Sequence, residues 1–155
     1  PYEPARVPDV GIINLGTNDA ANGADAGAFS DGVRGLVGQI RELYGEEIPI
    51  VWAYNMMSEG NSSLVRAVFR EMGGEEAGLF TVSLSRDTAG GNGHPSVSGH
   101  EKAAAELSEF LTRKGLTDGT WRDKTEEYPS LDAEAAGPGM SLPWADGLTK
   151  SQKED

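Results

Sequence analysis

Residues 90–100 read GGNGHPSVSGH and contain both histidines of the chain, His94 and His100. The first half of this stretch is rich in glycine, and the second half opens an amphipathic segment. A histidine that a glycine loop holds just before a helix can turn its ring toward a cleft, which suits a general base. The structural alternative is a loop histidine that caps or packs against the helix, and only the flanking sequence separates the two.

The segments on both sides of this loop predict a strand and a helix. A short apolar run at residues 79–84 is typical of a buried strand in a parallel sheet. After the loop, apolar residues recur at helical spacing until Lys114 and Gly115, and Ser98 together with Glu101 fits a capping box. The histidine loop therefore connects the end of a strand to the start of a helix.

The same alternation continues toward the amino terminus. Apolar runs at residues 9–15 and 48–54 predict two more buried strands, and an amphipathic helix follows each of them. Residues 20–28 are expected to form a loop, and Gly45 is expected to end the first of these helices. The residues expected to cap the helices are Ser30 or Asp31 for the first and Ser62 or Ser63 for the second.

Successive strand–helix units predict an α/β fold, because right-handed crossovers between parallel strands lay the helices on the sheet. A sheet this narrow has two open edges, so we expect residues 1–116 to be the carboxyl-terminal part of a larger domain. Residues 117–155 are acidic and lack a sustained period, so they are expected to form a loop-rich tail, partly disordered or wrapped on the surface. The aromatic residues that would dock this tail are Trp121, Tyr128 and Trp144.

The composition excludes several kinds of function. The net charge of −12 disfavours nucleic acids and anionic membranes as partners, and it is compatible with a neutral substrate such as a sugar or an ester. The favoured interpretation of this charge is that it serves solubility only. The absence of cysteine rules out disulfides, thiolate metal sites and cysteine nucleophiles. No apolar run approaches the ~20 residues that a membrane span needs.

Polar residues follow the expected strands at the edge of the sheet where ligands bind. Asn18, Asn55 and the loop at residues 85–94 each come after a strand, and the carboxyl ends of parallel strands share one edge. Trp52 and Tyr54 alternate along the second strand, so they point to the same face. Core packing is the favoured interpretation for both, and the ring that reaches the strand end is a candidate for stacking on a sugar.

Two motifs resemble a known superfamily of hydrolases. Residues 16–19 (GTND) after a strand and residues 94–100 before the last helix look like blocks III and V of the SGNH (GDSL-type) hydrolases. Residues 13–19 (INLGTND), preceded by residues 7–9 (VPD), most resemble the esterase domain of carbohydrate esterase family two, whose members deacetylate plant polysaccharides. The resemblance covers about residues 7–115 and implies a three-layer α/β/α, flavodoxin-like fold.

The resemblance also implies roles for individual residues. Asn18 would donate its side-chain amide to the oxyanion hole, and His94 would be the general base that activates a serine. His100, its structural neighbour, is expected to pack at the start of the helix and not to take part in catalysis. These roles agree with the chemistry, because acyl transfer develops an oxyanion that needs fixed donors and a serine hydroxyl needs an adjacent base. The reaction would pass through a serine acyl-enzyme, without a metal or another cofactor.

The sequence departs from the family pattern at the nucleophile. No Gly-Asp-Ser occurs in the 155 residues, and block II with its oxyanion glycine is also missing. Both blocks lie amino-terminal to block III in the family, so the expected partner is a missing amino-terminal part of the same domain. Ser58 and Ser96 are rejected as replacement nucleophiles, because neither sits in a sharp elbow at which a strand turns directly into a helix.

A second departure concerns the group that orients the histidine. Many relatives place an aspartate three residues before this histidine, where Gly91 stands here. The candidates for its role are a backbone carbonyl, which some members of family two use, and Asp87.

The resemblance thus implies part of a secreted serine esterase that removes acetyl groups from a carbohydrate, with a small-molecule or polysaccharide ester as the substrate. The alternative is a non-catalytic carbohydrate-binding protein that keeps the same fold and cleft without the chemistry. Extracellular localisation follows from the resemblance alone.

Overall fold

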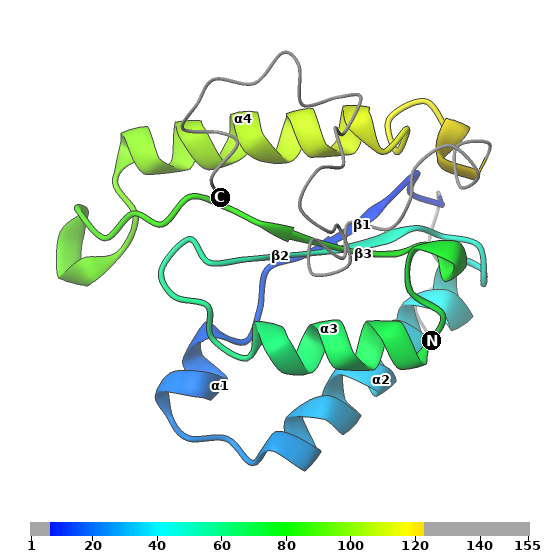
Figure 1. Ribbon diagram of the computed structural model, residues 1–155, viewed down its shortest axis with the longest axis horizontal. Helices are drawn as coiled ribbons and strands as arrows, with labels where there is room; N and C mark the ends of the chain where they lie inside the picture. Colours follow the sequence, from blue (N-terminus) through cyan, green and yellow to red (C-terminus); the bar gives the residue numbers. More distant parts are fainter. Residues whose placement is uncertain (1–6, 123–155) are drawn as a thin grey trace, which may run out of the picture.

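A parallel sheet lies at the centre of residues 7–122, the part of the chain that the computed structural model describes (Figure 1). Its strands are β1 (Gly11–Ile13), β2 (Ile50–Tyr54) and β3 (Leu79–Ser83), in the spatial order β1-β2-β3. Both strand pairs are parallel, so the described carboxyl ends lie at one edge. The predicted α/β fold with a parallel, flavodoxin-like sheet is confirmed.

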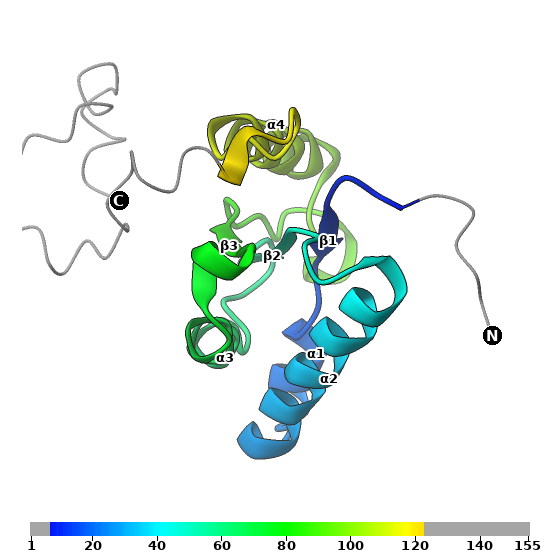
Figure 2. The same ribbon diagram turned by 90° about the vertical axis from the view of Figure 1, so that its right-hand side faces the viewer.

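Helices cover both faces of this sheet (Figure 2). α2 (Ala26–Tyr44) connects β1 to β2, and α3 (Ser62–Glu71) lies between β2 and β3 in the sequence; both lie on the same face. α4 (Val97–Arg113) follows β3 and lies on the opposite face. The shorter elements are α1 (Thr17–Ala21) and the 3₁₀ turns η1 (Gly74–Ala77), η2 (Gly91–Gly93) and η3 (Thr120–Arg122).

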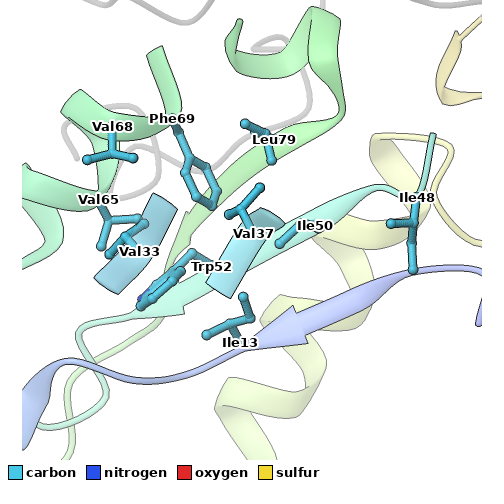
Figure 3. Packing of buried hydrophobic residues seen from close by; sticks show 10 residues of the cluster. All are labelled: Ile13, Val33, Val37, Ile48, Ile50, Trp52, Val65, Val68, Phe69 and Leu79. Carbon is cyan, nitrogen blue, oxygen red and sulfur yellow. The ribbon is translucent and has the colours of Figure 1, made fainter. Parts of the chain in front are cut away.

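The larger part of the core lies between the sheet and the pair α2 and α3 (Figure 3). Trp52 is 2% exposed and meets Phe69 edge to face, with 6.1 Å between the ring centroids. The prediction that Trp52 packs in the core is therefore confirmed. The buried residues of this cluster are Ile13, Val33, Val37, Ile48, Ile50, Trp52, Val65, Val68, Phe69 and Leu79.

A second core cluster lies under α4. Val51 and Phe80 from the sheet are buried against Phe110 and Leu116. Trp121 packs edge to face on Phe80, with 5.8 Å between the ring centroids, so this aromatic residue of the expected tail lies on the core. The other two aromatic residues predicted to dock the tail, Tyr128 and Trp144, lie outside the described residues.

The start of α2 differs from the expectation. Asp25 is the N-cap, and its carboxylate accepts a hydrogen bond from the Ala28 amide at 2.9 Å, so the predicted caps Ser30 and Asp31 lie inside the helix. The loop expected at residues 20–28 is also wrong at both ends, because α1 and α2 extend into it. The high glycine content of this region concealed a helix start that the Asp25 side chain stabilises.

The other two helix starts also differ. α3 has Asn61 as its N-cap, and Ser62 lies inside the helix with its hydroxyl accepting a hydrogen bond from Arg66 at 3.2 Å. α4 is capped by Ser96, which accepts a hydrogen bond from the Gly99 amide at 3.1 Å, so the capping box expected at Ser98 is wrong. The reason at α4 is local, because Ser96 is the residue with an extended backbone directly before the helix.

None of the helices in residues 7–122 is both long and apolar enough to cross a membrane.

Candidate active site

A cleft of about 200 Å³ opens at the carboxyl ends of the strands, the edge at which the sequence predicts a site. Its walls come from the segments after β1 and β2 and from the histidine loop before α4. Both histidines of the chain, His94 and His100, line it. The structure therefore brings together parts of the chain that lie about 80 residues apart in the sequence.

The wall after β1 is held to the rest of the sheet by side-chain hydrogen bonds. The Asn14 amide nitrogen donates to the Ala53 main-chain oxygen at 3.0 Å, and the Trp52 indole nitrogen donates to the Leu15 oxygen at 3.1 Å. Gly16 follows with φ at +103°, and a Cβ there would lie 3.1 Å from the Phe29 ring. This turn needs glycine both for its backbone conformation and for the approach of Phe29.

Asn18, the predicted oxyanion donor, lies in α1 directly beyond this wall. Gly16 and Thr17 line the cleft, whereas Asn18 is exposed and is not among the described residues that line it. Its main-chain oxygen accepts a hydrogen bond from the Asn22 side chain at 2.8 Å. The role of Asn18 stays a prediction, and it requires the amide to turn toward the cleft from the neighbouring position.

The wall after β2 carries an aromatic ring and a loop. Tyr54 reaches the strand end and lines the cleft; its hydroxyl accepts a hydrogen bond from Arg66 at 3.0 Å, and the Arg66 guanidinium lies 5.4 Å from the ring centroid. Asn55 follows with φ at 78°, and its amide donates to the Ser83 hydroxyl at 3.2 Å. Trp52 also lines the cleft but is 2% exposed, so Tyr54, which is half-buried, is the ring of the predicted pair that offers more surface to a ligand.

The loop that follows contributes Ser58, which the sequence excluded as the nucleophile, and three residues that the sequence patterns did not single out. Met56, Met57, Ser58 and Glu59 all line the cleft, and Glu59 is the one carboxylate among its described lining residues. The loop has no period, so its only sequence signal was its place after a strand.

His94 lies on the third wall, in a loop whose backbone is closed by hydrogen bonds. The Gly90 amide donates to the His94 oxygen at 2.8 Å, and the His94 amide donates to the Gly91 oxygen at 3.1 Å. The His94 side chain is exposed, so it is open to a ligand in the cleft.

Within residues 7–122, no group of three or more histidines and carboxylates is arranged to hold a metal ion.

Asp87, the candidate orienting acid, is bonded to Ser96 rather than to His94. Its carboxylate accepts hydrogen bonds from the Ser96 hydroxyl and from the amides of Ala89 at 2.7 Å and Ser96 at 3.2 Å. These hydrogen bonds hold the pKa of the carboxyl below its ordinary value, and the bond from the Ser96 hydroxyl has the largest effect, before the bond from the Ala89 amide. Among the described residues, none of its hydrogen bonds comes from His94.

Comparison with known proteins bears on the fold. No protein-family model and no curated protein matches the chain. Among solved structures, the chain is similar to an acetyl xylan esterase from the rumen bacterium Butyrivibrio proteoclasticus, with a TM-score of 0.58 and 21% sequence identity. The match covers 72% of this chain and 38% of that chain, so the chain spans well under half the length of that esterase. At this identity, the likeness establishes that the two proteins share an α/β fold.

Proposed function

We propose that these residues form the carboxyl-terminal part of a serine esterase of the SGNH type, which removes O-acetyl groups from a carbohydrate. The observation that carries the proposal is the cleft itself, in which His94 and the Gly16–Thr17 turn face one space at the carboxyl ends of the sheet. The fold shared with an acetyl xylan esterase supports it. The acidic net charge of −12 suits a neutral sugar ester better than a polyanion.

In the proposed reaction, His94 takes the proton from a serine hydroxyl whose oxygen attacks the acetyl carbonyl carbon. The carbonyl oxygen becomes an oxyanion, to which the Asn18 side-chain amide donates. When the tetrahedral intermediate collapses, the sugar oxygen leaves and accepts the proton from His94. His94 then deprotonates a water molecule that attacks the acetyl-serine. When the second intermediate collapses, the serine oxygen leaves and takes this proton back from His94, and the acetyl group is released as acetic acid, which ionises to acetate.

The described serines that line the cleft, Ser58 and Ser62, and Ser96 beside His94 are not suited to be the nucleophile. Ser62 is buried and bonded to Arg66, and Ser96 donates its hydroxyl proton to Asp87. Ser58 lines the cleft, but it lies in the middle of the long loop that connects β2 to α3, not in a tight turn directly between a strand and a helix. We therefore assign the serine to an amino-terminal part of the same domain.

The outer edge of β1 is where that part would join the sheet. Within residues 7–122, β1 pairs with β2 alone, and the side chains of Ile12 and Leu15 are 47% and 61% exposed. A further strand at this edge would cover Ile12 and would end beside Leu15, which lines the cleft. Under this proposal, the protein acts outside the cell, where plant polysaccharides are found.

An aryl acetate assay tests the proposal on two proteins: the 155-residue chain, and the same chain extended by any residues encoded upstream of Pro1. We expect turnover only in the extended protein, and we expect His94→Ala to remove it. Turnover by the 155 residues that His94→Ala leaves unchanged contradicts the proposal. If that turnover is lost in Ser58→Ala, the nucleophile is Ser58 and the assignment of the serine is wrong.

Calorimetry with acetylated and deacetylated oligosaccharides separates the esterase from the non-catalytic alternative. A carbohydrate-binding protein without the chemistry would bind such sugars and show no turnover in either protein. An esterase would bind the acetylated sugar and convert it to the deacetylated one.

A further inference from the structure

Asp87 connects three segments around the cleft through its main-chain amide and its carboxylate. The Asp87 amide donates to the main-chain oxygen of Met56, in the loop after β2, at 2.9 Å. One carboxylate oxygen accepts from the Ala89 amide at 2.7 Å, and the other accepts from the amide and the hydroxyl of Ser96. Asp87 thus connects a wall of the cleft to the residue that caps α4.

The hydrogen bonds of Ser96 have a fixed direction. A carboxylate can only accept, so the single hydroxyl proton of Ser96 goes to Asp87. The Ser96 oxygen then accepts from the Gly99 amide at 3.1 Å, and in its 3.0 Å contact with the Ser98 hydroxyl the proton belongs to Ser98. Only one placement of the hydroxyl protons therefore satisfies all the hydrogen bonds from Asp87 through Ser96 to the first turn of α4.

Gly99 allows the carboxylate to approach this turn. Gly99 is buried, and a Cβ at this position would overlap the Asp87 carboxylate. Any larger residue there has to push Asp87 away from Ser96. The contact between the carboxylate and the helix start depends on this glycine.

His94 lies between two fixed parts of its loop, the glycines before it and Ser96 after it. On the amino-terminal side, Gly90 and Gly91 hold the backbone of His94. On the carboxyl-terminal side, Ser96 is held by Asp87, and only Pro95 separates it from His94. A proline restricts the backbone between the two, so the position of Ser96 largely sets that of His94.

We propose that Asp87 is a positioning residue that acts through Ser96 and Gly99 to hold the His94 ring in the cleft. Its effect on catalysis rests on the esterase function proposed above. Its effect on the geometry of the loop does not. The two effects call for separate measurements.

Amide hydrogen exchange in the 155-residue chain tests the geometry. Asp87→Ala should raise the exchange rates of the His94, Ser96 and Gly99 amides at least about tenfold relative to the unchanged chain, because their local opening becomes easier. Asp25→Ala is the matched control, since Asp25 caps α2 by the same chemistry and should raise exchange at Ala28 instead. Unchanged exchange at His94 in Asp87→Ala overturns the proposal.

Kinetics on the extended esterase test the catalytic consequence. Asp87→Ala and Gly99→Ala should lower kcat by about 10- to 100-fold with little change in KM. Each substitution displaces the base, whereas the groups that bind the substrate stay in place. Ser96→Ala should behave alike, whereas Ser96→Thr keeps the hydroxyl and should retain most of the activity. Gly32→Ala is the control for Gly99→Ala, because a Cβ there meets no atom within 4 Å.

The outcomes of the two experiments are distinguishable. If kcat per folded molecule is unchanged in Asp87→Ala, or if Ser96→Thr is as impaired as Ser96→Ala, the positioning role is wrong. If Asp87→Ala does not fold, the comparison of Ser96→Ala with Ser96→Thr decides in its place. If the extended protein has no esterase activity at all, the proposed function fails, and hydrogen exchange alone decides whether Asp87 holds the loop.

Discussion

The indole nitrogen of Trp52 donates a hydrogen bond to the main-chain oxygen of Leu15, with 3.1 Å between the two atoms. Trp52 is 2% exposed and belongs to the core, whereas Leu15 is 61% exposed and lines the cleft. The core therefore positions the turn at Gly16 that leads to Asn18. Packing beneath the sheet and the geometry of the candidate active site are coupled through this bond.

Trp52→Phe should lower the free energy of unfolding by about 1–3 kcal/mol, because it removes this bond and leaves a gap beside Phe69. Urea unfolding measures the loss. Phe69→Leu is the control, since it disturbs the same packing and leaves the bond to Leu15 in place. Faster amide exchange at Gly16 in Trp52→Phe but not in Phe69→Leu is expected, and equal exchange in both variants would show that the bond does not hold the turn.

Gly16→Ala should destabilise the chain by about 1–3 kcal/mol, because the residue has φ at +103° and the new Cβ would lie 3.1 Å from the Phe29 ring. Gly38→Ala in α2 is the matched control, since nothing lies within 4 Å of a Cβ there. Alanine is the better helix former, so Gly38→Ala should stabilise by about 0.5–1 kcal/mol. Thermal and urea unfolding measure both values, and a neutral Gly16→Ala would rule out the conformation described for this turn.

Asp25→Ala should cost about 1 kcal/mol of unfolding free energy, because it removes the carboxylate that accepts from the Ala28 amide at the start of α2. Ser30→Ala is the control, because Ser30 lies inside the helix and its hydroxyl donates to the Ala26 oxygen. That substitution should change stability by less than about 0.5 kcal/mol. If urea unfolding shows a larger loss of free energy for Ser30→Ala than for Asp25→Ala, the helix starts at Ser30 instead.

The contribution of Asp87 to stability should depend on pH in the acid range. Its pKa is held below the ordinary value of 3.8 in the folded chain, first by the Ser96 hydroxyl and then by the Ala89 amide. The folded state therefore favours the charged carboxylate, and the stabilisation is present above about pH 4 and is lost as the pH falls through the folded pKa. The measurement is the free energy of unfolding of the unchanged chain and of Asp87→Ala between pH 2 and 7. If the difference between these two free energies does not change with pH, the hydrogen bonds do not lower the pKa of Asp87.

The order of strands and helices was predictable from the sequence because each element carries a strong periodic signal. The run at residues 48–54 is apolar throughout, since β2 is the central strand and both of its faces are covered. The helix starts were not predictable in the same way. Asp25, Asn61 and Ser96 each compete with a nearby serine or aspartate for the cap, and only the backbone conformation decides between them.

The candidate site was predictable in outline and not in its contacts. The sequence placed His94 at the sheet edge because a strand and a helix flank its loop, and the cleft lies there. Asp87 was a candidate to orient His94, but its carboxylate accepts hydrogen bonds from Ser96 and Ala89 instead. Such a choice between two neighbours depends on side-chain directions, which sequence spacing does not contain. The loop with Ser58 and Glu59 has no period and gave no signal beyond its place after β2.

A comparison of the two histidines in the cleft tests most directly the proposed role of His94 as the general base of an esterase. The measurement is kcat/KM for an aryl acetate in the extended protein and in its His94→Ala and His100→Ala variants. We predict that His94→Ala lowers kcat/KM by at least about 100-fold, the usual contribution of a general base, and that His100→Ala stays within about tenfold of the unchanged protein. Activity that survives in His94→Ala would contradict the role of His94 as the general base.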